Sequence, residues 1–145
     1  MMQSSSNGRK PRYEVDLAAI VEQFLLEQGC SKVVGELKFF DRLIDLYGVA
    51  ASPKSRSFAV ELKLSNWQKA LRQAVIYQLC ADYAYVAMPE AVARVLDLKL
   101  FRDAGVGLLG VSLDTQNVRV VLHPARSRSR NVHYVKAFSN YLNTV

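Results

Sequence analysis

Two carboxylates and a lysine in the first half of the chain have the types and spacing needed for metal-assisted hydrolysis. Asp45 lies in the apolar run 43–47, and Glu61 and Lys63 follow in a segment where apolar residues alternate with others. Because side chains alternate across a strand, Glu61 and Lys63 share one face. On neighbouring strands, the two carboxylates and the backbone carbonyl of Leu62 supply the oxygen ligands that Mg²⁺ prefers. Lys63 then orients the attacking water and offsets developing negative charge, as hydrolysis of a phosphodiester requires.

A helix expected over residues 67–81 adds three polar groups to this region. Gln73 and Tyr77 are four residues apart, so they lie on one helix face, and Lys69 adds to that face. Packed beside the strand of Glu61, this helix presents an amide and a phenol to a phosphate or a base. Ser65 and Asn66 are residues that cap a helix start.

Each of these residues taken alone also has a purely structural explanation. Asp45 can face solvent or pair with Arg42 or Lys63, since ionisable residues in strands are usually solvated or paired. A charged pair on the outer face of a half-buried strand is common. Gln73 and Tyr77 both tolerate boundary positions. The combination of order, spacing and strand–strand–helix context favours the catalytic interpretation.

In this combination the sequence resembles the PD-(D/E)xK superfamily of nucleases. Asp45, the tripeptide Glu61-Leu62-Lys63 and the Gln73-x-x-x-Tyr77 pair carry the resemblance, and the last pair is similar to the branch related to the RecB nuclease domain and lambda exonuclease. The resemblance covers about residues 22–88. It implies a restriction-endonuclease-like core of helix, three strands, helix and strand.

The resemblance also implies a cofactor and its ligands. Mg²⁺ or Mn²⁺ would be held by Asp45 and Glu61, with Lys63 at the water. Glu22, on the first expected helix, matches an acidic residue that many members use as a further metal ligand. The residue before Asp45 is Ile44 where many members have proline.

The tripeptide Glu-Leu-Lys occurs twice, at residues 36–38 and 61–63. The later copy is the better candidate, because an acidic strand residue precedes it and the Gln-x-x-x-Tyr pair follows it. The earlier copy lacks both neighbours.

Hydrophobic periodicity predicts an α/β fold with a central mixed sheet flanked by helices. The first three strands are expected to form an antiparallel meander, and the strand after the long helix to pair in parallel through a crossover. The expected helices cover residues 17–28, 67–81, 90–103 and 131–143, and the expected strands cover residues 33–40, 43–49, 57–64, 83–88, 105–113 and 118–123.

Composition indicates a basic protein with one domain. The 145 residues carry a net charge of +6, which favours a polyanionic partner. Residues 1–12 are expected to be a flexible lead-in and residues 13–145 a single nuclease-like domain. Cys30 and Cys80 suit reduced, buried positions and form no zinc or iron–sulfur pattern. No run is long enough for a membrane span, and the polar N-terminus lacks a signal-peptide core, so we expect a cytoplasmic location.

A basic loop late in the chain is a second candidate for contact with nucleic acid. Arg126, Arg128 and Arg130 alternate with serines, and together with Lys69 they are expected to contact phosphates. The alternative for the loop is a solvated, mobile connection.

These observations predict a metal-dependent DNA nuclease that is directed by structure or ends, because the chain has little room for a sequence-reading domain. Holliday junction resolvase-like endonucleases are similarly small and basic, and by that analogy we expect a homodimer or a partner protein for targeting. The alternatives are a non-catalytic nucleic-acid-binding or scaffold module of the same fold, and a basic structural subunit of a larger assembly.

Overall fold

A six-stranded mixed sheet, in the order β1-β2-β3-β4-β5-β6, organises the chain in the computed structural model, which describes residues 12–145. The lead-in predicted for residues 1–12 therefore lies outside the described residues, apart from Arg12. The strands are β1 (Lys32–Phe39), β2 (Arg42–Ala50), β3 (Arg56–Leu62), β4 (Tyr83–Pro89), β5 (Gly107–Ser112) and β6 (Asn117–Leu122). The helices are α1 (Val15–Glu27), α2 (Trp67–Tyr77), α3 (Glu90–Ala93), α4 (Lys99–Ala104) and α5 (Val132–Leu142).

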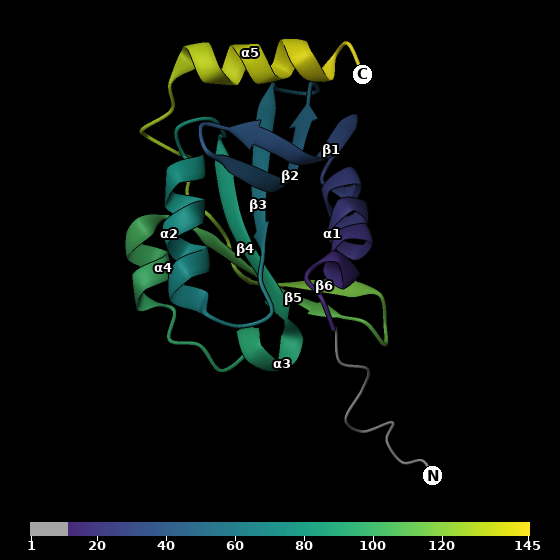
Figure 1. The fold of residues 1–145 in the computed structure, drawn as a ribbon, viewed down its shortest axis with the longest axis vertical. Coiled ribbons are helices and arrows are strands. Elements are labelled where there is room, and N and C mark those ends of the chain that lie inside the picture. Colours follow the sequence, from purple (N-terminus) through teal and green to yellow (C-terminus); the bar gives the residue numbers. More distant parts are fainter. Residues whose placement is uncertain (1–11) are drawn as a thin grey trace.

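The predicted α/β class, with a mixed sheet flanked by helices, is confirmed. β1, β2 and β3 form the expected antiparallel meander, and β4 pairs in parallel with β3 after the α2 crossover. β5 continues the parallel part, and β6 returns antiparallel to it. α1 covers one face of the sheet, α2 and α4 cover the other, and α5 runs alongside β1 (Figure 1).

The alternation in β3 places its side chains on two faces, as predicted, and both faces are covered by apolar clusters. Phe58, Val60 and Leu62 join the cluster under α1, and Leu64 packs against the same cluster. Ala59 belongs to the cluster under α2. Glu61, two residues on from Ala59, is therefore directed towards α2.

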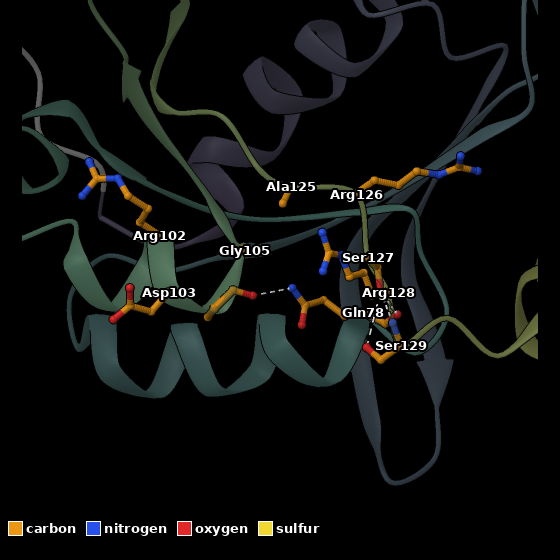
Figure 2. Close-up of a pocket in the computed structure, with 10 residues that line it drawn as sticks. Gln78, Arg102, Asp103, Gly105, Ala125, Arg126, Ser127, Arg128 and Ser129 are labelled. Atoms are coloured by element: carbon orange, nitrogen blue, oxygen red, sulfur yellow. Dashed lines mark hydrogen bonds between the residues drawn. The ribbon is translucent and has the colours of Figure 1, made fainter.

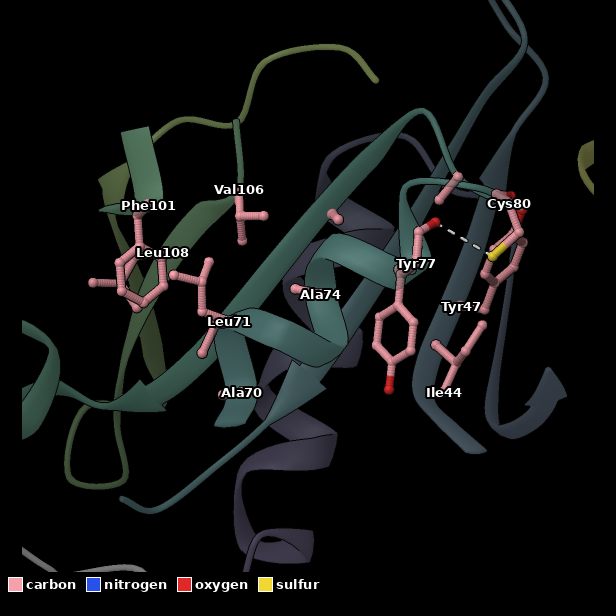
Figure 3. Packing of buried hydrophobic residues seen from close by; sticks show 14 of the residues in the cluster. Ile44, Tyr47, Ala70, Leu71, Ala74, Tyr77, Cys80, Phe101, Val106 and Leu108 are labelled. Carbon is pink, nitrogen blue, oxygen red and sulfur yellow. Dashed lines mark hydrogen bonds between the residues drawn. The ribbon is translucent and has the colours of Figure 1, made fainter. Parts of the chain in front are cut away.

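Large aromatic side chains fill the core between α2 and the meander. Tyr77 extends from α2 alongside Ile44 and Tyr47 of β2 (Figure 3), and all three side chains are buried. The Tyr47 hydroxyl donates to the Cys80 carbonyl at 2.5 Å. Phe138 of α5 meets Tyr47 edge to face, with ring centroids 5.2 Å apart, so α5 closes this core.

The helix predicted over residues 90–103 is wrong in its middle. It divides into α3 and α4, because the Asp97 side chain accepts the Lys99 amide at 3.0 Å and so supports a new helix start. Glu90 of α3 instead forms an ion pair with Arg119 of β6 at 2.7 Å. A Cβ at Gly110 would stand 2.1 Å from the Glu90 carboxylate, so the glycine makes room for this contact.

Asp82 anchors the C-terminal loop to the sheet. Its buried carboxylate accepts from the Ser57 amide at 2.8 Å and from the Ser57 hydroxyl at 3.0 Å. The same group pairs with Arg126 at 3.1 Å and with Arg130 at 2.5 Å. The Ser127 amide donates to the Asp82 carbonyl at 2.7 Å, so both ends of this residue hold the loop.

Both cysteines are free and buried, as predicted. Burial raises the pKa of the Cys30 thiol to about 11 and that of Cys80 to about 12, so neither is a ready nucleophile at neutral pH. Within residues 12–145, no helix is long and apolar enough to cross a membrane.

Replacing Asp82 by asparagine should destabilise the protein. The new amide oxygen could still accept from Ser57, but Arg126 and Arg130 would lose their buried counter-charge. We expect the free energy of unfolding to fall by about 1–3 kcal/mol in urea titrations. Amide exchange over residues 124–131 should quicken. Asp41→Asn is the control, because the Asp41 side chain is 86% exposed and should change stability by less than about 0.5 kcal/mol. Equal stability of the two variants would contradict the anchoring role.

Candidate active site

The ladder between β2 and β3 opens where the two candidate carboxylates stand. Antiparallel pairing extends from Ala50–Arg56 to Leu46–Val60 and stops before Asp45 and Glu61. The Leu62 amide instead donates to the Asp45 carboxylate at 2.8 Å. A side-chain oxygen thus takes the place of a strand carbonyl as the acceptor. Asp45 and Glu61 both lie just beyond the last paired residues of the ladder.

A local distortion of β2 accompanies this opening. Ile44 packs in the cluster under α2, whereas Leu46 packs in the cluster under α1, although residues two apart in a regular strand share a face. Opposite Asp45 on β1, Glu36 adopts a φ of 54°, and the register passes from Gly35–Leu46 to Leu37–Ile44. Asp45 therefore sits at a break in the alternation.

The carboxyl groups of Asp45 and Glu61 lie close enough that each changes the pKa of the other. Burial raises the pKa of Glu61 to about 7; Tyr77 opposes this increase and the charge of Asp45 adds to it. Burial also raises the pKa of Asp45, against the hydrogen bond from Leu62. The charge of Lys63 lowers both pKa values, although among residues 12–145 the lysine forms no ion pair with either carboxylate. Burial thus favours the uncharged form of each acid, and a bound cation would favour the charged form.

Tyr77 supports Glu61 through a short hydrogen bond. Its hydroxyl donates to Glu61 Oε1 at 2.6 Å and lies 3.3 Å from the Leu43 carbonyl. Burial and the hydrogen bond to Glu61 raise the pKa of the phenol. The phenol therefore stays protonated and acts as a donor that holds one carboxylate oxygen in place.

Gln73 reaches this region through Arg42, a residue that the motif does not include. Arg42 Nη1 donates to Gln73 Oε1 at 2.6 Å, and the guanidinium also pairs with Asp41 at 3.3 Å. The charge of Arg42 lowers the pKa of Tyr77. Gln73 thus holds the Arg42 guanidinium on the face of α2 that carries Tyr77. Arg42 contacts Gln73 and Asp41 instead of pairing with Asp45.

Glu14, the N-cap residue of α1, is the acidic residue of this helix whose charge affects Asp45. Its charge raises the pKa of Asp45. Glu22 is exposed and lies eight residues further along the helix, about 12 Å at 1.5 Å per residue. Sequence reasoning passed over Glu14 because it expected the helix cap at Asp16, whereas the N-cap residue is Glu14. The Asp16 carboxylate instead accepts from the Arg12 and Tyr13 amides.

The basic residues are spread away from the carboxylates. Lys69 is exposed in the first turn of α2, which Asn66 caps. Arg126 and Arg130 are held by Asp82 beside Ser57, near the start of β3, about 13 Å along the strand from Glu61. The structure therefore brings together Asp45, Glu61, Lys63 and Tyr77, and it leaves the arginine loop at the opposite end of the sheet.

No group of three or more His, Cys, Asp or Glu side chains within the described range could hold a metal ion by itself. Mg²⁺ is commonly bound by one or two carboxylates, with waters and substrate phosphates as the remaining ligands. The oxygen-only pair of Asp45 and Glu61 fits that lower requirement.

Comparison with known proteins supports the fold and goes no further. No family model matches the chain, and no curated protein matches it either. Among solved structures, the chain is similar to the SPO1766 protein of unknown function from Silicibacter pomeroyi. The two share 20% sequence identity with a TM-score of 0.65, over 88% of this chain and 82% of the other.

Without divalent cations, stability should fall as the pH rises towards neutrality. The folded state keeps the Glu61 proton up to about pH 7, whereas the unfolded chain loses it near the ordinary value of 4.5. The folded state therefore binds more protons between these values, and the free energy of unfolding decreases as the pH rises through this window. We expect a loss of about 1–3 kcal/mol in urea titrations from pH 5 to 8 in EDTA.

Glu61→Gln should remove most of this pH dependence, because its side-chain oxygen still accepts from Tyr77 but carries no charge. Glu36→Gln, at the exposed earlier tripeptide, should keep the slope of the natural protein. A Glu61→Gln variant with the same slope as the natural protein would show that Glu61 does not titrate in this range.

Proposed function

We propose that this protein is a metal-dependent DNA nuclease with a restriction-endonuclease-like core, in which Asp45 and Glu61 hold Mg²⁺ or Mn²⁺. The observation that carries the proposal is the carboxylate pair at the opened end of the β2–β3 ladder, where the charge of Lys63 acts on both groups. A buried acidic pair of this kind costs free energy that a bound cation would offset.

In this proposal each residue has one task. Asp45, Glu61 and the Leu62 carbonyl present oxygens to the metal. When bound, the metal polarises a phosphoryl oxygen and lowers the pKa of an attacking water. Lys63 orients that water and offsets the negative charge that develops on the phosphate.

The residues of α2 act as support for the carboxylates. Tyr77 fixes Glu61 by donating its phenol proton, and Gln73 holds Arg42 near the phenol. Lys69 and the arginine loop contribute positive charge for a DNA backbone. Cutting directed by structure or ends, with a homodimer or partner protein for targeting, remains part of the proposal because the six-stranded domain has no second reading module among residues 12–145.

A non-catalytic nucleic-acid-binding or scaffold module is the second candidate. One oxygen of each carboxylate is already engaged within the protein, by the Leu62 amide and by the Tyr77 hydroxyl. Such internal contacts favour a purely structural use of the pair. Metal-dependent cleavage separates the two candidates.

Cleavage of labelled single-stranded, duplex, flap and four-way-junction DNA with Mg²⁺ or Mn²⁺ tests the proposal. Glu61→Gln and Lys63→Ala should each lower the rate by about 100-fold or more, because each removes a group that acts on the transition state. The matched controls are Glu36→Gln and Lys38→Ala in the earlier Glu-Leu-Lys tripeptide, which should change the rate by less than about twofold.

Three outcomes of this experiment are informative. If cleavage is lost in Glu61→Gln and Lys63→Ala but not in the two controls, the result supports the site. The preferred substrate then identifies the subclass of nuclease. Equal activity in all variants, or cleavage that persists in EDTA, would exclude the proposed centre. Folded protein that binds DNA without cutting any substrate would favour the binding module.

Glu14, at the start of α1, gives a separate prediction. Glu14→Gln should weaken Mn²⁺ binding by about 5–10-fold in calorimetry, since removing a nearby negative charge reduces attraction for a cation. Glu22→Gln removes the same charge two helical turns away and should change the affinity by less than about twofold. The reverse ranking would instead identify Glu22 as the ligand on this helix.

A further inference from the structure

A hollow of about 440 Å³ lies between α4 and the loop that follows β6 (Figure 2). α4 forms one side, the loop around Ser127 forms the other, and Gln78 lies between them. Its charged lining residues are Arg102, Asp103, Arg126 and Arg128. The hollow is distinct from the carboxylate pair, because Gln78 precedes β4 and Gly105 precedes β5, at the opposite end of the parallel strands from Glu61.

The loop side of this hollow is held in place by hydrogen bonds. The buried Ser127 hydroxyl donates to the Gln78 carbonyl at 2.7 Å, and the Ser129 amide donates to the Ser127 hydroxyl at 3.2 Å. The Ala125 amide donates to the Gly105 carbonyl at 3.1 Å. These hydrogen bonds tie the backbone of the loop to α2 and to the segment between α4 and β5.

The charges of the lining are unequally compensated. Arg126 is paired with Asp82, and Asp103 is paired with Lys99 at 2.7 Å. Arg102 and Arg128 have no acidic partner among residues 12–145. Two exposed arginines without an acidic partner thus line the hollow. Figure 2 shows the Arg102 side chain extending away from the loop, so its guanidinium would have to turn towards Arg128 to share a ligand.

We propose that this hollow binds a phosphate group, with Arg102 and Arg128 as its guanidinium partners and the Ser129 hydroxyl as a further donor. Guanidinium groups are suited to phosphate because their donors match two of its oxygens. With DNA as the source of the phosphate, this inference rests on the proposed function and gives the arginine loop a defined binding site, which needs neither metal nor cleavage.

Two sources of phosphate fit this chemistry: the backbone of a nucleic acid, or a small phosphorylated molecule. The arginine loop lies about 13 Å along β3 from Glu61, which corresponds to about four base pairs at 3.4 Å each. A nucleic acid held at both places would therefore make phosphate contacts well away from the carboxylates.

Binding measured in EDTA tests the site without involving catalysis. A fluorescent strand of about 20 nucleotides, long enough to span both places, and the matching duplex are titrated at several salt concentrations, and inorganic phosphate and a nucleoside triphosphate are titrated by calorimetry. The variants are Arg102→Ser, Arg128→Ser and the double variant. Arg94→Ser is the matched control, because Arg94 is an exposed arginine outside the hollow. Unfolding titrations verify that each variant is folded.

We expect each variant at the hollow to weaken DNA binding by about 5–10-fold at moderate salt and to reduce the slope of log affinity against log salt by about one. Arg94→Ser should change affinity by less than about twofold. The same losses seen only with phosphate or the triphosphate would also support the site, with a small molecule as the source. Losses equal to those of Arg94→Ser, or no binding of any probe, would overturn the proposal.

Discussion

The candidate site depends on one hydrogen bond, which the Leu62 amide donates to the Asp45 carboxylate. A strand amide left without an acceptor in the interior is costly, so an opened ladder needs a substitute. Asp45 supplies that substitute, which lets β2 and β3 separate at their ends and places Asp45 against Glu61. The same separation lets Tyr77 reach Glu61 from α2.

The two ends of the parallel strands have different electrostatic character. At the Glu61 end, the carboxyl groups of Asp45 and Glu61 are both partly buried. The positive charge of Lys63 compensates for only part of their negative charge. At the Ser57 end, the buried carboxylate of Asp82 is fully engaged by two arginines and by Ser57. Removing one partner of a fully paired buried charge destabilises the fold, whereas incompletely paired carboxylates can still bind a cation.

Asp82 also explains how a serine- and arginine-rich loop can be an ordered part of the surface. It pairs with Arg126 and Arg130, whose side chains remain partly exposed, and leaves Arg128 without an acidic partner beside the hollow. α5 then follows directly from the loop and packs through Phe138 on Tyr47. The C-terminal part of the chain is thus tied to both the sheet and the aromatic core.

The sequence by itself determined the order of most elements and the division of β3 between two faces, because local periodicity reflects burial. It also selected Asp45, Glu61, Lys63 and Tyr77, since their spacing follows strand and helix geometry. It did not reveal the opening of the β2–β3 ladder or the proximity of Glu14 to Asp45. Only the tertiary structure decided these two features, because each depends on contacts or charges between segments distant along the chain, and a local pattern carries no information on such approaches.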